Sequence, residues 1–169
     1  MAVHPSQQIS RMSALDSLGS WLEATQVAQV VGSSMWTVAS LSAVHVLGYA
    51  LVMGGALVGN LRLLGVIVPS VPVSDVVGPA SRGITYGLVI SIVTGILLVS
   101  WKAVAAFGND IFRIKMLLLL VAALLHFAWQ ARVARNVSAD GGALKLAGGV
   151  GLILWLGLAL AAAAYILFE

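Results

Sequence analysis

The fold is decided by residues 34–65, SMWTVASLSAVHVLGYALVMGGALVGNLRLLG, a stretch apolar and long enough to cross a bilayer. His45 lies near its middle, glycines recur after it, and the run ends in NLRLLG. A titratable ring at bilayer depth predicts a functional site, because polar groups are costly to bury in hydrocarbon. Only one other histidine, His126, lies in an apolar run, so the functional interpretation depends on this pair.

The composition is that of an integral membrane protein. Of 169 residues, 60% are hydrophobic and 9% are charged, whereas soluble proteins have about half and about a quarter. The net charge of +3 comes from basic residues at loop ends, which suits a membrane protein and excludes a phosphate-tracking nucleic-acid surface. The absence of cysteine excludes disulfides, iron–sulfur clusters and covalently attached haem.

Four apolar runs reach the length of about 20 residues that a membrane-spanning helix needs. These runs predict spans at residues 34–60, 82–107, 111–135 and 143–168. Pro69, Pro72 and Pro79 predict a loop between the first two spans. The sequence therefore predicts an all-α, single-domain bundle of four transmembrane helices.

Residues 13–31 precede the first span and place apolar side chains at helical spacing between polar ones. This pattern predicts an amphipathic helix that lies in the membrane interface. A helix packed on the extramembrane end of the bundle fits the pattern equally. The first 20 residues lack the apolar core of a cleaved signal peptide, so the first span is expected to direct its own insertion.

The loop charges predict how the chain is oriented. Five Lys or Arg residues fall on the side of the first and third loops, and four fall on the opposite side. The positive-inside rule then places both termini outside, on the periplasmic face of a bacterial inner membrane.

Glycines form a strip on the first span. At about 100° per residue, Gly48, Gly55 and Gly59 fall on one side of the helix, offset modestly from His45. Gly55-x-x-x-Gly59 matches the small-xxx-small pattern by which membrane helices pack closely. A flat macrocycle could use the same smooth surface.

The third span carries Lys115 and His126 on one face, eleven positions apart. His126 lies roughly 22 Å below the start of its helix and His45 roughly 16 Å below its own, at 1.5 Å per residue. Histidines at similar depth on two helices suit bis-histidine ligation of one haem b. Lys115 is then placed to pair with a haem propionate, whereas Arg62 lies nearer the opposite surface.

Other interpretations of these residues stay open. A membrane histidine often only hydrogen-bonds across helices, and Lys115 can extend toward the headgroups. A copper site without porphyrin would prefer sulfur ligands or several imidazoles. The spans carry no carboxylate at their centres and no serine–histidine spacing that indicates hydrolytic chemistry.

The motif His45-Val46-Leu47-Gly48, followed by the NLRLLG run, resembles an uncharacterised bacterial family of small four-helix membrane proteins. That family shows H-x-x-G and D-L-R-L-L-G, and Asn60 stands here in place of the aspartate. The pattern Phe112-x-x-Lys115 with His126 is similar to copper-resistance D-type proteins and to haem-dependent membrane protoporphyrinogen oxidases. This resemblance implies a haem-compatible bundle but names no substrate.

The leading hypothesis is a b-type cytochrome subunit in which His45 and His126 bind one haem. It would pass electrons between quinone and a partner protein on the outer face. The main alternative is a cofactor-free anchor or assembly subunit, a homo-oligomer or part of a larger membrane complex, whose glycine strips pack helices. A third is a porphyrin-oxidising enzyme or a copper-handling membrane protein.

Overall fold

The computed structural model describes residues 14–130 and 141–167, and every regular element in those ranges is helical. Four helices are long and apolar enough to cross a membrane. They are α4 (Met35–Leu63), α5 (Val73–Ser100), α7 (Asp110–Leu125), which continues into the turn η1 (His126–Gln130), and α9 (Gly141–Leu167). The chain is therefore a multi-pass membrane protein with a four-helix bundle, as predicted. The predicted end of the third span, residues 131–135, lies outside the described ranges.

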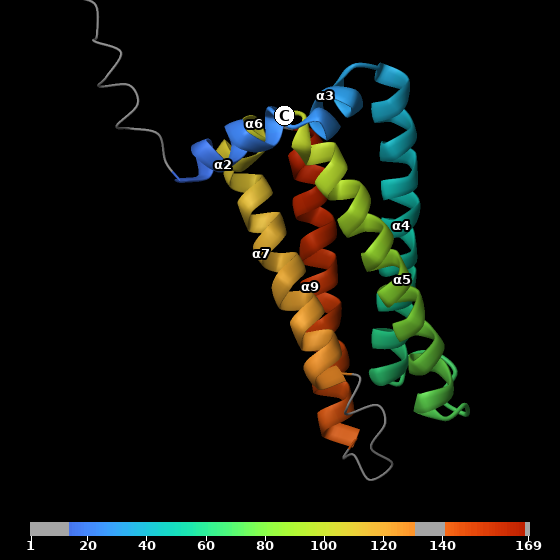
Figure 1. Ribbon diagram of the computed structural model, residues 1–169. Coiled ribbons are helices and arrows are strands. Elements are labelled where there is room, and N and C mark those ends of the chain that lie inside the picture. The colour runs from blue at the N-terminus through green and yellow to red at the C-terminus, as the bar shows by residue number, and fades with distance from the viewer. Residues whose placement is uncertain (1–13, 131–140, 168–169) are drawn as a thin grey trace, which may run out of the picture.

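Three short helices lie at the end of the bundle where α9 ends (Figure 1). They are α2 (Ala14–Glu23), α3 (Gln26–Gly32) and α6 (Ala103–Gly108). The single helix predicted over residues 13–31 is thus two helices. Thr25 separates them, because its hydroxyl donates to the Leu22 carbonyl at 2.6 Å and accepts from the Ala28 amide at 3.3 Å. A hydroxyl that bonds the backbone in this way caps a new helix.

Helix α2 packs on α6 at this end of the bundle. Glu23 Oε1 accepts a hydrogen bond of 2.8 Å from the Val104 amide. A Cβ atom at Gly19 would come within 2.9 Å of the same nitrogen, so the backbones are in close contact. Leu18 and Trp21 stay exposed on the outer side of α2. This apolar face suits the membrane interface while the opposite face holds the bundle.

The second span was predicted wrongly at both ends, since α5 runs from Val73 to Ser100 rather than over residues 82–107. Pro72 caps the helix and Pro79 lies inside it, where it lacks the amide that would bond to the Asp75 carbonyl. Burial of Val77 against Leu63 of α4 and Ala147 of α9 compensates for that lost hydrogen bond. At the other end, the break after Ser100 separates α6 as its own short helix.

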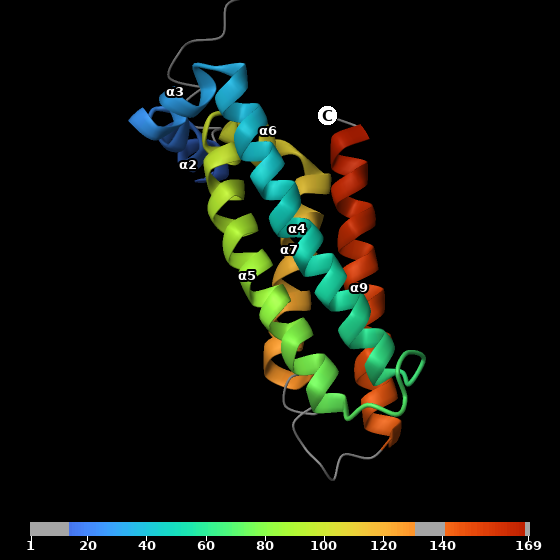
Figure 2. The same ribbon diagram turned by 90° about the vertical axis from the view of Figure 1, so that its right-hand side faces the viewer.

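Helices α4 and α5 form a close antiparallel pair (Figure 2). A Cβ atom at Gly48 would lie 2.7 Å from Ser91 Oγ, and one at Gly55 would lie 2.6 Å from the Ala80 carbonyl oxygen. A Cβ atom at Gly87 would lie 2.5 Å from the Gly48 carbonyl oxygen. Real Cβ atoms do not approach so closely, so glycine is required for the helices to pack at this distance.

The core joins all four long helices at the middle of the bundle. Trp155 of α9, only 1% exposed, packs with buried residues of α4, α5 and α7. Those residues are Val52, Ala56, Ile84, Leu88 and Ala122. Trp36 at the start of α4, by contrast, is 84% exposed.

Helix α7 has a side-chain cap at its N-terminus. Asn109 is the N-cap, because its side chain accepts hydrogen bonds from the Ile111 and Phe112 amides at 2.9 and 3.1 Å. Asp110 instead forms an ion pair with Arg113 at 3.2 Å. Phe112, in the first turn, packs on Tyr165 near the end of α9 and so aligns the two helices.

We expect Gly87→Ala to lower the thermal stability of the protein in detergent. The added methyl group collides with the Gly48 carbonyl oxygen and comes within 2.8 Å of the Val52 amide nitrogen, and overpacking of this kind costs about 1–3 kcal/mol. Gly78→Ala is the matched control on the same helix, because a Cβ atom there meets nothing within 4 Å. Equal melting temperatures for the two variants would contradict the close contact.

Candidate functional site

His45 of α4 is held against α5 by a hydrogen bond of 2.9 Å between its Nδ1 atom and Thr94 Oγ1. The Thr94 hydroxyl donates its one proton to the Ile90 carbonyl, at 2.7 Å, and therefore accepts from the imidazole. Nδ1 consequently carries the ring proton, and Nε2 keeps its lone pair. Gly95 makes room for the ring, since a Cβ atom there would lie 3.1 Å from His45 Cε1.

Lys115 of α7 lies near enough to His45 for the two groups to interact electrostatically. Its ammonium lies 4.7 Å from the centre of the Tyr165 ring and 5.4 Å from that of Phe112. Cation–π contacts of this kind stabilise a charge away from water. The bundle thus brings the charge of Lys115 on α7 within electrostatic reach of His45 on α4.

Two residues with hydroxyl groups lie within about one helical turn of His45 on α4 and of Thr94 on α5. Tyr49 is one helical turn from His45 on the same side of α4, and Ser91 is three residues before Thr94 on α5. The Tyr49 hydroxyl and Ser91 Oγ are both buried without a hydrogen-bond partner within the described part of the chain. We call His45, Tyr49, Ser91, Thr94 and Lys115 the His45 site.

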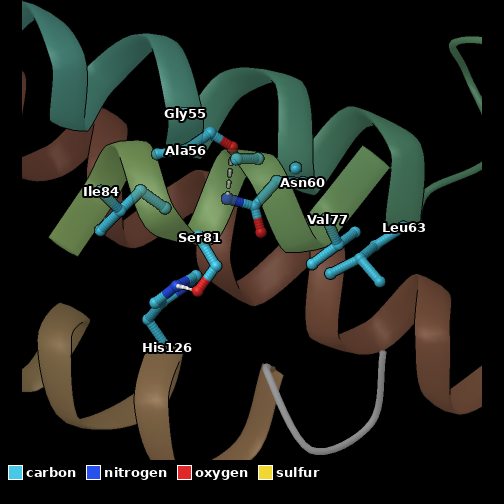
Figure 3. Close-up of a pocket in the computed structure, with 10 residues that line it drawn as sticks. Gly55, Ala56, Asn60, Leu63, Val77, Ser81, Ile84 and His126 are labelled. Carbon is cyan, nitrogen blue, oxygen red and sulfur yellow. Dashed lines mark hydrogen bonds between the residues drawn. The ribbon is translucent and has the colours of Figure 1, made fainter. Parts of the chain in front are cut away.

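His126 belongs to a different place in the bundle. Its Nε2 atom lies 2.9 Å from Ser81 Oγ of α5, and the residue is only 4% exposed. The π-helical turn η1 begins at His126, and such turns are rare and often found at functional sites. Asn60 of α4, 2% exposed, donates from Nδ2 to the Ala56 carbonyl at 2.7 Å. Figure 3 shows Asn60, Ser81 and His126 reaching one small pocket from three elements.

The structure does not bring His45 and His126 together. Their partners on α5, Thr94 and Ser81, are 13 residues apart, which is about 20 Å along a helix. The apolar core around Trp155 lies between the two levels. Two imidazoles that bind one haem iron must face each other across a single flat ring. Bis-histidine ligation of one haem therefore does not fit this helix packing.

The other predicted cofactor residues also lie away from His45 or are covered. Gly48 and Gly55 face α5 directly, so no macrocycle can lie on that part of the strip. Gly59 lines the pocket beside His126. Arg62 is buried at the far end of α4, where its guanidinium donates to the Val71 and Pro69 carbonyls and holds the loop to α5.

Sequence reasoning missed the hydroxyl partners that orient both histidines. Thr94 is 49 residues from His45, and Ser81 is 45 residues from His126. Which hydroxyl group meets each histidine depends on the register between two helices. The spacing of residues along one helix does not predict that register. Within residues 14–130 and 141–167, no group of three or more His, Cys, Asp and Glu side chains gathers where it could hold a metal ion.

Comparison with known proteins relates the chain to a family. Residues 9–169 match a family model described as a family of unknown function, DUF6644. No curated protein and no solved structure matches the chain.

We expect Thr94→Val to weaken the hydrogen bond of the His45 ring, because valine keeps the shape of threonine but offers no acceptor. The Nδ1 proton resonance of His45 should move upfield and broaden in spectra of protein labelled with ¹⁵N-histidine. Thr85→Val is the control, since that hydroxyl is exposed and bonds only the Ser81 carbonyl at 2.8 Å. An unchanged His45 resonance in Thr94→Val would show that Thr94 does not hold the ring.

Proposed function

Because the chain belongs to DUF6644, a family of unknown function, we propose its activity from its own residues: a haem-binding subunit that transfers electrons in the membrane. His45 Nε2 would bind the iron of one haem b, and Lys115 would pair with a propionate. The observation that carries this proposal is the hydrogen bond from His45 Nδ1 to Thr94.

The state of the His45 ring supports its role as a ligand. Metal-binding histidines almost always donate their other ring N–H to a neighbouring group, which fixes the tautomer and orients the ring. Thr94 accepts this hydrogen bond from His45. Because the Thr94 hydroxyl donates its own proton to the Ile90 carbonyl, the backbone of α5 fixes the position of the threonine oxygen. Nε2 is then the nitrogen with a free lone pair.

The charges around the site support binding of an anionic cofactor. Lys115 and His45 are both basic, and the carboxylates described on the four long helices are in first turns, Asp75 of α5 and Asp110 of α7. The Lys115 ammonium lies over the Phe112 and Tyr165 rings, and its positive charge would attract a propionate. When bound, haem supplies one-electron chemistry, and the protein orients and tunes it.

This proposal differs from the sequence-based hypothesis in the number of histidine ligands. His126 is hydrogen-bonded to Ser81 about 20 Å further along α5 and does not serve the same haem. The iron would take one ligand from the chain, His45. The electron partners proposed are quinone in the bilayer and a protein at the end that carries α2, α3 and α6.

A cofactor-free anchor subunit remains the second candidate, and one observation favours it. Ala50 and Gly54 are exposed on α4, and a Cβ atom at Gly54 would meet nothing within 4 Å. Ala50-x-x-x-Gly54 is a small-xxx-small pair that faces away from the bundle, where another membrane helix could pack closely.

The absorption spectrum of the purified protein, expressed with ample haem and reduced with dithionite, tests the proposal. We expect a haem Soret band that is lost in His45→Ala and kept in His126→Ala, and Lys115→Met should weaken haem retention. Loss of the band in both histidine variants, each shown to be folded by circular dichroism, would instead restore bis-histidine ligation. A colourless wild-type protein would contradict haem binding and favour the anchor function.

The proposed orientation places both termini on the periplasmic face of a bacterial inner membrane. Because the chain has no cysteine, single cysteines report topology without a background. Gln29→Cys on α3 should react with a membrane-impermeant maleimide in intact cells, whereas Ser74→Cys at the start of α5 should react only after permeabilisation. Both residues are exposed, so the reverse pattern would show the opposite orientation.

A further inference from the structure

The loop between α4 and α5 is exposed although it is almost wholly apolar. Residues 65–72 read GVIVPSVP, with Ser70 as the one polar side chain and no charged residue. Val66 is 67% exposed and Val68 is 47% exposed. Loops that face water are polar, whereas exposed apolar surface often marks a site of contact with a membrane. The composition of this loop therefore indicates contact with lipid.

The loop lies at the level of the lipid headgroups. Helix α4 has 29 residues, so it is about 44 Å long at 1.5 Å per residue. A bilayer with its headgroup regions is ~40–45 Å thick. The last turn of α4 and the loop that follows it therefore reach the phosphate groups of one leaflet, at the end of the bundle where α9 begins (Figure 2).

Arg62 brings a buried positive charge to this loop. The residue is 8% exposed, and its Nε and Nη2 atoms donate to the Val71 and Pro69 carbonyls at 3.2 and 3.4 Å. Both acceptors are neutral, and Arg62 forms no ion pair with any carboxylate that the structure describes. A buried charge is costly unless an opposite charge pairs with it.

The guanidinium of Arg62 keeps donors for such a partner. Its hydrogen bonds to the loop leave from Nε and Nη2, and Nη1 makes none within the described part of the chain. Nη1 carries two N–H groups. The loop thus holds the guanidinium in place while two of its donors remain for an anion.

The other charges in this half of the bundle also favour an anion. Arg82 of α5 and Lys145 of α9 are exposed, and neither forms an ion pair with a described residue. Asp75, the one carboxylate described in this half, is exposed and accepts from the Ser74 hydroxyl at 3.1 Å. The described cations therefore exceed the described carboxylates by two. Basic residues at this level of a membrane attract anionic lipids.

We propose that Arg62 and the loop of residues 65–72 bind the headgroup of an anionic phospholipid. Nη1 of Arg62 donates to a phosphate oxygen, and the exposed Val66 and Val68 lie among the neighbouring acyl chains. Arginine suits this role because its planar guanidinium matches the geometry of a phosphate group. The phosphate comes from a lipid, because the exposed valines gain nothing from a free ion.

This site is separate from the proposed haem function. Arg62 follows His45 by 17 residues on α4, which is about 26 Å along the helix. A lipid bound at Arg62 therefore cannot contact the His45 site, and the two proposals can fail independently.

Spin-labelled lipids test the proposal on the full chain, prepared without haem in phosphatidylcholine vesicles. Electron paramagnetic resonance distinguishes lipids held at the protein from mobile ones, for labelled phosphatidylglycerol and, separately, labelled phosphatidylcholine. We expect the wild type to hold phosphatidylglycerol in preference. Arg62→Gln should lower that preference about fivefold, the effect of one basic residue at an anionic surface. Glutamine still offers a donor to the loop carbonyls.

Arg82→Gln is the matched control, because it removes the same charge in the same half of the bundle from an exposed side chain. The preference should stay near that of the wild type. Arg62→Lys keeps the charge and should retain most of the preference. Val66→Asp changes a side chain that is 67% exposed, so the fold tolerates it. Its carboxylate repels the phosphate and should abolish the preference, which keeps the test decisive should Arg62→Gln fold poorly.

Three results would overturn the proposal: equal retention of both lipids by the wild type, an undiminished preference in Arg62→Gln, or an equal loss in Arg82→Gln. The last would show attraction by the charge of the whole surface rather than by Arg62. Inorganic phosphate, added at constant ionic strength, should leave the preference unchanged. Displacement of the labelled lipid by inorganic phosphate would assign the site to a free anion and refute lipid binding.

Discussion

The close contact between α4 and α5 is the constraint on which the rest of the structure depends. Gly48, Gly55 and Gly87 let the two backbones approach to a distance that no larger residue allows. In lipid, this packing and interhelical hydrogen bonds replace the hydrophobic effect as the force that joins helices. The contact also sets the register of the pair, and the register decides that His45 meets Thr94 and Gly95.

The separation of the two histidines follows from where the helices begin. His45 is the eleventh residue of α4, and His126 follows the sixteenth and last residue of α7. Helix α4 begins further toward the end that carries the short helices than α7 does (Figures 1 and 2). The depths estimated from the sequence for the two histidines assumed that α4 and α7 begin at the same level. That assumption placed His126 near His45, although His126 lies eleven residues beyond Lys115.

The architecture could be predicted from the sequence because hydropathy alone defines membrane spans. Four long apolar runs predict four helices, and composition excludes a soluble fold. Helix ends were predicted less well, since Pro79 was read as part of a loop although burial of Val77 holds the helix around it. The partners of the histidines could not be predicted, because Thr94 and Ser81 meet them only through the register between helices.

The two sites differ through one detail of hydroxyl chemistry. Thr94 commits its proton to the Ile90 carbonyl, so it can only accept from His45, and the imidazole is left with a free Nε2 lone pair. Ser81 makes no comparable bond to the preceding turn, and its oxygen serves His126 and the pocket. Thr94 thereby fixes the tautomer of His45, whereas Ser81 can either donate to His126 or accept from it. Helix α5 thus orients two histidines through two hydroxyl groups that lie about 20 Å apart along its axis.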